Sequence, residues 1–398
     1  MKYNGLVISD IHVGAMDLIK TQQEFSDIFI NHINKMKKLD FVVVTGDFFD
    51  HKFYLGDKEA IVAHAMLKEL IEACKEKNAV LRFVYGTEFH EANQYDVLSL
   101  LKIYDKVDVV KYVSEEELLP GMNVLYLPEE HIFSKSEYYK DYLTNEKKYD
   151  YIFGHGVIRE VMKEVAIHME NKESNNKRKK VPVFSNAELK YACKGQTFFG
   201  HYHINKEIDG KVISVGSFNR WKFGEEESKG FYKISCDTEK CKYKAEFIEN
   251  TMTSIYKTIS FGYDNKIFNS EVDMDDTLNG IDSMIKRDVY DHVRFMFNVP
   301  ETIENPEATI NYLKERYKFK ENIKLEIVHG YIEKKKQLQK EEADSEDEKF
   351  KFIFDNSMEI EDKISKFISI IYSKDIPRDR VSKYIFSSLN EIINEVEE

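Results

Sequence analysis

The stretch "FFGHYH", residues 198–203, places His201 and His203 at alternate positions directly after an apolar run. Side chains two residues apart on an extended chain point to the same side. Both imidazoles should therefore face one point, where a predicted strand ends. The chain has only 12 histidines, so a pair in this arrangement prompts a search for other polar side chains directed to the same point.

Four further predicted strands end in a similar way. The runs "NGLVISD" and "DFVVVTGD" close on acidic residues, and "LRFVYG" and "YDYIF" lead into the turns "GTEFHE" and "FGHG". Apolar runs of this length are typical of buried parallel strands, whose carboxyl ends meet at one edge of a sheet. The polar residues at these turns are Asp10, His12, Asp47, His90 and His155.

The types of these residues indicate a metal centre. Carboxylate and imidazole together suit Mn, Fe or Zn, and none of the four cysteines falls in any of these turns. Taken singly, each residue has an ordinary explanation: a histidine at a strand end is more often structural, and Asp47 could cap a helix. The ordered series DxH, GD, GTxxH, GHG, GHxH is hard to obtain by chance. Its residues exceed the needs of one metal, so we predict a dinuclear site with a bridging aspartate.

Length and composition set broad limits. A chain of 398 residues should contain two or three domains. No apolar run approaches the roughly 20 residues that span a bilayer, and the N-terminus lacks the layout of a signal peptide. With its scattered cysteines, the chain is expected to be a cytoplasmic protein without a membrane partner. Its net charge of −13 argues against coating DNA through bulk charge.

The pattern of strands and helices predicts four regions. Residues 1–250 alternate strand-like and helix-like stretches and should form a layered α/β domain with its ligands at one sheet edge. Residues 251–333 read as strand, helix, strand, helix, strand, a small α+β domain. Residues 334–357 form a charged linker. Residues 358–398 hold two short amphipathic helices that are too short to bury a core alone and should dock on a partner.

The motif series, together with "ISVGSFNRWKFGEEESKGFY" (213–232), resembles the SbcD-type DNA double-strand-break repair nucleases of the calcineurin-like metallophosphoesterase superfamily. Phage recombination endonuclease subunits carry a related version. The resemblance covers essentially the whole chain, is most specific in the catalytic domain, and is least specific in the tail. It implies a two-layer metallophosphoesterase sandwich, a small α+β capping domain that binds DNA, and a C-terminal helical segment that binds an SbcC-type coiled-coil ATPase.

The resemblance also implies a role for each motif residue. His90 matches the general acid that protonates the leaving 3′ oxygen. Thr87 stands where the family usually has an asparagine ligand of the second metal, and is therefore a candidate ligand. The implied metal ligands are Asp10, His12 and His203 for the first ion, His155 and His201 for the second, and Asp47 for both.

Arg220 and Lys222, in the stretch that resembles the nucleases, are candidate contacts to DNA phosphates; a solvated surface is the alternative. The helices near 58–77 and 95–104 correspond to those through which the family forms homodimers; packing within one chain is the alternative.

Three functions are consistent with the sequence. The first is an exonuclease or endonuclease that uses two divalent ions, with Mn expected and Mg, Fe or Zn as alternatives. It would act with the ATPase on double-strand ends or branched DNA in recombination or repair, in a bacterial cell or a phage-infected host. The second is a phosphodiesterase or phosphatase for small substrates. The third is a subunit that binds DNA or a partner without cutting, because Thr87 has impaired the site.

Overall fold

The computed structural model describes most of the first 261 residues and parts of the region that follows. The described residues are 1–54, 56–96, 104–143, 149–161, 179–261, 276, 278–280, 282–283, 291–299, 306–317 and 323–329. They divide into two compact units, the first made of Met1–Thr258 and Met284–Arg294. Among the described residues, none of the helices combines the length and apolar character that a membrane span requires.

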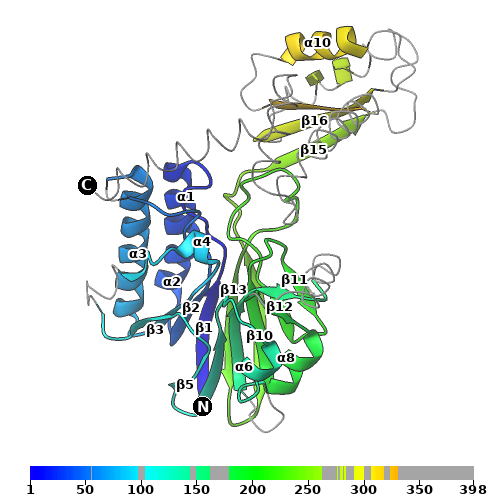
Figure 1. The fold of residues 1–398 in the computed structure, drawn as a ribbon. Coiled ribbons are helices and arrows are strands. Elements are labelled where there is room, and N and C mark those ends of the chain that lie inside the picture. The colour runs from blue at the N-terminus through cyan, green and yellow to red at the C-terminus, as the bar shows by residue number, and fades with distance from the viewer. Residues whose placement is uncertain are drawn as a thin grey trace, which may run out of the picture. The chain divides into compact units, whose positions relative to one another are not determined.

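The first unit contains two six-stranded mixed sheets (Figure 1). The first sheet has the order β14-β13-β1-β2-β3-β4, in which β1 to β4 are parallel and β13 and β14 are antiparallel additions. Its strands are β1 (Lys2–Ile8), β2 (Phe41–Thr45), β3 (Val80–Val84), β4 (Val107–Val110), β13 (Gly230–Asp237) and β14 (Lys242–Glu249).

The second sheet has the order β11-β12-β10-β7-β6-β5, with β6, β7, β10 and β12 parallel. The edge strands β5 and β11 are antiparallel to their neighbours. Its strands are β5 (Ser114–Leu119), β6 (Met122–Leu127), β7 (Tyr149–His155), β10 (Cys193–Gly200), β11 (Lys206–Ile208) and β12 (Val212–Ser214). A two-stranded sheet of β8 (Val157–Ile158) and β9 (Val183–Phe184) follows β7.

The two sheets pack face to face over one apolar interior. Val7 and Val43 of the first sheet belong to the same buried cluster as Tyr126, Phe153 and Phe198 of the second. Aromatic rings fill much of this interior: Phe153 stacks on Phe198 with ring centroids 6.0 Å apart. Burial on both faces explains why the sequence of these strands shows continuous apolar runs instead of alternation.

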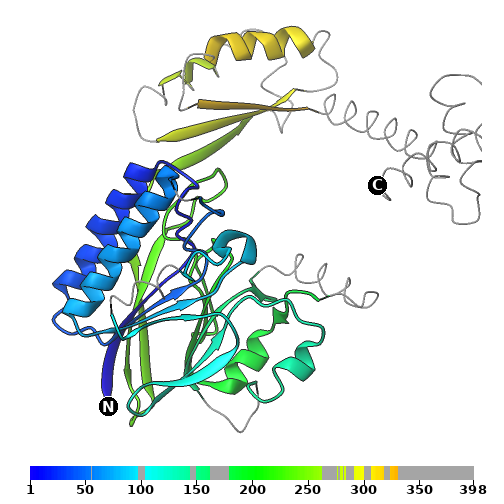
Figure 2. The same cartoon turned by 60° about the vertical axis from the view of Figure 1, so that its left-hand side comes forward.

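Helices cover the outer faces of the sheets. On the first sheet, α1 (Leu18–Glu24), a π-helical segment η1 (Phe25–Ile30) and α2 (Asn31–Lys35) run beside α3 (Lys58–Glu76) (Figure 2). The spacing of apolar residues over 25–36 predicts one helix there, and the structure continues it back to Leu18 with a π-helical middle. The short helices α4 (Glu88–Glu91), α6 (Lys135–Tyr138) and α8 (Asn186–Ala192) follow β3, β6 and β9.

The second unit, Ile259–Ser283 and Phe295–Glu398, holds one described helix and most of a three-stranded sheet of order β15-β16-β17, whose first two strands begin within the residue ranges of the first unit. Its elements are β15 (Tyr256–Phe261), β16 (His292–Val299), α10 (Pro306–Tyr317) and β17 (Ile323–His329). The helix predicted over 277–288 is described only in part. The predicted linker at 334–357 and the predicted helices in 358–398 lie outside the described residues.

The architecture is a mixed α/β fold with two large mixed sheets, in agreement with the layered α/β fold expected from the sequence. The parallel strands of both sheets direct their carboxyl ends to one edge of the first unit. This edge carries the motif residues.

Candidate metal centre

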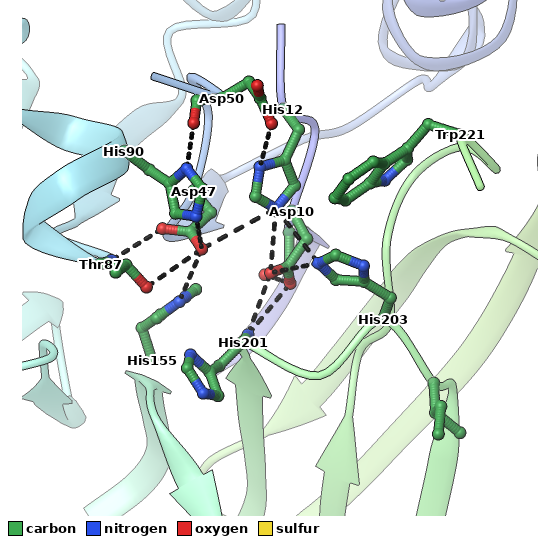
Figure 3. A network of polar contacts seen from close by, with 12 residues as sticks. Asp10, His12, Asp47, Asp50, Thr87, His90, His155, His201, His203 and Trp221 are labelled. Carbon is green, nitrogen blue, oxygen red and sulfur yellow. Dashed lines mark hydrogen bonds and ion pairs between the residues drawn. The ribbon is translucent and has the colours of Figure 1, made fainter. Parts of the chain in front are cut away.

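The motif residues extend in the sequence from Asp10 to His203. They come together at the carboxyl ends of five parallel strands (Figure 3). They follow or end β1, β2 and β3 in one sheet and β7 and β10 in the other. Their polar atoms form four overlapping groups, each of which could hold a metal ion. The groups are Asp10–His12–His203, His12–Asp50–His90, Glu129–His155–His201 and Asp10–Asp47–His155.

The first metal group consists of Asp10, His12 and His203. Nε2 of each histidine lies 3.8 Å from Oδ1 of Asp10. The two Nε2 atoms are only 3.2 Å apart. Asp10 and His12 are almost fully buried, with 0% and 1% exposure, so their polar atoms depend on one another or on a bound ion.

The other ring nitrogens of this pair are directed at carboxylates. His203 Nδ1 lies 2.9 Å from Glu225 Oε1, and His12 Nδ1 lies 3.5 Å from Asp50 Oδ1. A proton on each Nδ1 leaves the two Nε2 lone pairs facing each other, an arrangement that a shared cation would stabilise. These residues therefore fit a divalent metal.

The second metal group contains Asp47 and His155, with His201 and Glu129 beside them. His155 Nδ1 is held 2.8 Å from the Thr45 carbonyl oxygen, so its Nε2 is directed at Asp47 Oδ2, 3.2 Å away. His201 Nδ1 lies 3.1 Å from Glu129 Oε2. A carbonyl that fixes one ring nitrogen and frees the other is the usual support of a metal-binding histidine.

Asp47 lies between the two groups. Its Oδ2 is 3.8 Å from His12 Nε2 on one side and 3.2 Å from His155 Nε2 on the other. A carboxylate that bridges two ions has to lie between their ligands; the bridging role of Asp47 stays a prediction.

The backbone that presents these ligands is strained. Asp10, His12, Asp47 and His201 have φ of 49°, 48°, 50° and 96°, in or near the left-handed region that residues other than glycine rarely adopt. Such conformations cost of order 1–3 kcal/mol each and cluster at functional sites. Four of them at one sheet edge indicate that the fold holds these side chains in place at the expense of stability.

Charges within the centre are mutually dependent. Burial alone would raise the pKa of Asp47, but the charge and hydrogen bond of His155 lower it below its usual value. Burial disfavours the charged form of His12, yet Asp10 and Asp50 raise its pKa to about 9. Burial likewise opposes charge on His155, while Asp47 raises its pKa to about 10. A metal would replace the protons that balance the carboxylates.

His90, the predicted general acid, lies at the edge of the centre. Its Nε2 is 4.0 Å from Asp47 Oδ2, and its side chain is about one quarter exposed. Its Nδ1 contacts the Asp50 carbonyl oxygen, which can only accept a hydrogen bond, so Nδ1 is the protonated nitrogen. Nε2 is thereby turned toward the metal groups.

Thr87 contacts two carboxylates. Its backbone N–H donates to Asp47 Oδ1 at 2.7 Å, and its Oγ1 lies 3.3 Å from both Asp47 Oδ2 and Glu129 Oε2. Its predicted role as a metal ligand stays a prediction.

Four residues of the centre were missed by the sequence reasoning: Asp50, Glu129, Glu225 and Trp221. Asp50 forms a metal-competent group with His12 and His90. Glu129 follows β6 in "LPEE", and that strand-then-acid pattern, the same as in "VISD", could have revealed it. Glu225 supports His203 from 22 residues away and has no local signal. Trp221 lies against both His12 and His203, with ring centroids 4.8 and 4.7 Å apart, and forms a wall of the first metal group.

The two candidate DNA contacts differ in their surroundings. Arg220 donates its guanidinium hydrogens to the Glu227 carbonyl oxygen at 2.8 and 3.1 Å, which holds the loop together. The Lys222 ammonium lies over the Trp221 ring, 4.6 Å from its centroid, and its side chain is more than half exposed. Contact with DNA by either residue stays a prediction.

Comparisons with known proteins add little to this geometry. No protein-family model matches the chain, and no curated protein matches it. One similar solved structure has 13% sequence identity, covers 62% of this chain and 99% of its own, and has a TM-score of 0.33. A similarity this low carries no argument about fold or function.

Proposed function

We propose that this chain is a DNA nuclease that hydrolyses phosphodiester bonds with two divalent metal ions. The observation that carries the proposal is a pair of metal-competent groups that meet at Asp47, beside a partly exposed histidine. Carboxylates and imidazoles are ligands that fit divalent ions and suit Mn. In several of the rings a hydrogen bond already fixes one nitrogen and leaves the other for an ion.

The residues divide the chemistry among themselves. Asp10, His12 and His203 would hold one ion, Asp47 would be shared, and His155 and His201 would hold the other. Two bound divalent ions would polarise the phosphodiester and lower the pKa of the attacking water.

His90 would supply the remaining proton transfer, and its position beside the metal groups supports this role. With its Nδ1 hydrogen held by the Asp50 carbonyl oxygen, a proton on Nε2 faces the shared carboxylate, where a phosphodiester would bind. From there it can protonate the leaving 3′ oxygen, a step that general acids accelerate by roughly 10²–10⁴-fold.

The choice of DNA and of partners comes from the resemblance. The stretch at 213–232 contributes Trp221 and Glu225 to the first metal group, and a separate α+β unit follows it in the chain. These features support a nuclease with a capping domain, whereas the SbcC-type ATPase partner and the homodimer rest on the resemblance alone. A phosphodiesterase for small substrates needs neither feature.

The test compares His90→Ala with His64→Ala, a control on α3 outside the metal groups. Protein loaded with Mn is incubated with labelled duplex DNA, with and without the ATPase, and its metal content is measured. We expect cleavage to fall about 100-fold or more in His90→Ala only, with metal content unchanged.

Other outcomes would favour the alternative functions. A generic aryl phosphodiester that turns over faster than duplex ends would point to a small-substrate enzyme. About one metal per chain and no cleavage, with the fold intact, would point to a binding subunit.

A further inference from the structure

Glu129 lies in the second metal group without a role from the sequence motifs. It comes two residues after the end of β6, which pairs with β7, and its backbone N–H donates to the Tyr85 carbonyl oxygen at 3.1 Å. Only 8% of the residue is exposed. Among the described residues no lysine or arginine pairs with it, and a buried carboxylate is costly unless a histidine or a metal ion balances its charge.

Its carboxylate belongs, with His155 and His201, to a group of side chains that could hold a metal ion. Oε2 lies 3.1 Å from His201 Nδ1, and its ligand atom lies within 4.8 Å of that of His155. Glu129 also lines a cavity of about 810 Å³ with Tyr85 and Glu88, which gives an ion a path from the surface.

Thr87 is poorly suited to bind the metal directly. A hydroxyl has a single hydrogen, and Oγ1 of Thr87 lies 3.3 Å from each of two carboxylate oxygens, on Asp47 and Glu129. Donation to one of these oxygens uses the only hydrogen of the hydroxyl. The neutral oxygen that remains is a weaker ligand than a carboxylate of the same centre.

We propose that Glu129 is the fourth protein ligand of the second metal, and that Thr87 is a positioning residue that holds Asp47 and Glu129. The inference rests on the dinuclear centre of the proposed function. The Glu129 carboxylate would take the place of the asparagine side chain that the resembling nucleases use as a ligand, so an anion stands where they have a neutral amide. The centre then has three carboxylates, those of Asp10, Asp47 and Glu129, against two divalent cations, which favours ions that prefer oxygen ligands.

The test is the Mn content of the full chain after equilibrium dialysis, with titration calorimetry for the affinity of each site. Glu129→Ala should lower the count from about two ions per chain to about one, because an oxygen ligand is removed. Glu129→Gln keeps a carbonyl oxygen and should retain the second ion with about tenfold weaker binding. The control is Glu130→Ala, the next residue, whose carboxylate instead bonds the Tyr138 hydroxyl at 2.6 Å and the Val113 N–H at 2.9 Å; it should keep both ions.

Thr87 is tested in parallel. Thr87→Val should keep two ions but weaken magnetic coupling between Mn ions in electron paramagnetic resonance, because the carboxylates lose their common support. Thr87→Ser should restore the coupling. The melting temperature in a chelator reports whether each variant folds. If Glu129→Ala does not fold, Glu129→Gln, which preserves the side-chain volume, still tests the ligand.

Two results would overturn the inference: two tightly bound ions in both Glu129 variants, or loss of one ion in Thr87→Val but not in Glu129→Ala. The inference and the proposed function can fail separately. A count that drops in Glu129→Ala while the wild type cuts no DNA supports the ligand and removes the nuclease. If the wild type cuts DNA and Glu129→Ala still binds two ions, the nuclease is supported and Glu129 is not a ligand.

Discussion

A histidine of the centre can present one ring nitrogen to a metal ion only when a hydrogen bond fixes its other ring nitrogen. His155 relies on a backbone carbonyl, whereas His203 relies on the Glu225 carboxylate, 2.9 Å from its Nδ1. Glu225 is itself 4% exposed, and its Oε2 accepts from the Trp221 backbone N–H at 3.3 Å. The support of His203 can therefore be removed by a side-chain substitution, unlike that of His155.

We expect Glu225→Ala to weaken Mn binding at the first metal group by about 10–100-fold, the usual cost of losing a partner of a metal-binding histidine. Isothermal titration calorimetry measures the effect. Glu226→Ala is the matched control, because that neighbouring carboxylate is nearly half exposed and pairs with Lys257 at 2.7 Å. Equal affinities in the two variants would contradict the supporting role of Glu225.

Asp47 lies so close to residue 86 that only glycine leaves enough space there. A Cβ atom on Gly86 would collide with both the carboxylate and the backbone nitrogen of Asp47. We expect Gly86→Ala to displace the shared ligand and to reduce the Mn content below about one ion per chain, since both groups use Asp47. Gly280→Ala, where an added Cβ meets open space, should leave the metal content unchanged in the same assay.

Single residues also mark the limit of prediction from sequence. Asp10, Asp47 and His155 could be found because each follows its own strand within a few residues. Glu129 and Glu225 act on histidines that are distant in sequence, and only the pairing of β6 with β7 and the path of the loop after β12 bring them there. Such contacts are non-local, so no spacing within one motif encodes them.

Among the elements, α1 ends on a buried acid. Glu24 has 0% exposure; Oε2 accepts from Asn250 Nδ2 at 2.9 Å, and Oε1 has no hydrogen-bond partner among the described residues. Burial raises the pKa of Glu24, and the hydrogen bond from Asn250 only partly opposes this. Folding therefore shifts the titration of this carboxyl to higher pH and makes its charged form less favourable than in the unfolded chain.

The sign of the resulting pH dependence follows from that direction. A pKa raised on folding contributes stability that is fully present below the unfolded pKa and is lost as the pH rises through the folded pKa. Glu24→Gln removes this titration. Its melting temperature should match that of the wild type near about pH 4 and exceed it by a few degrees near about pH 7.

Thermal unfolding across that pH range checks the prediction. The control is Glu72→Gln on α3, whose side chain is 56% exposed and should give no such trend. A Glu24→Gln difference that stays constant with pH would mean that the carboxyl is not protonated in the fold.

The central strands of the two large sheets were predictable because apolar runs bounded by turn residues specify buried strands. The edge strands β4, β5 and β11 were not predicted; β5 and β11, with the sequences SEEELL and KEI, carry no such run. The pairing order was not predictable, since β10 lies between β7 and β12 and β13 returns beside β1. The π-helical segment η1 is a further detail that apolar spacing over 25–36 does not distinguish from an α-helix.

At the scale of the first unit, the metal ligands come from both sheets. Two hydrogen bonds already cross between the sheets here: His155 Nδ1–H donates to the Thr45 carbonyl oxygen at 2.8 Å, and the His201 N–H donates to Asp10 Oδ1 at 3.1 Å. Bound ions would add further links. Metal binding should therefore stabilise the folded unit as a whole.

We expect a chelator to lower the melting temperature of this unit by about 5–10 °C relative to protein with Mn at about 100-fold its dissociation constant. Differential scanning calorimetry measures the shift. Asp47→Asn, which neutralises the carboxylate shared by both groups, should abolish most of it. A shift that persists in Asp47→Asn would place the stabilising ions elsewhere.

The interior between the sheets has a consequence for how this protein can vary. Ring contacts join the two sheets: Phe153 lies 6.3 Å from Phe41 of β2, and Phe198 lies 5.7 Å from Tyr232 of β13, measured between centroids. The candidate ligands near β1 and β2 meet those near β7 and β10 only when the sheets are aligned in this way. Replacing these rings should therefore change metal binding as well as stability, although neither ring is a candidate ligand. Evolution of the candidate metal centre is thereby tied to the evolution of the apolar core.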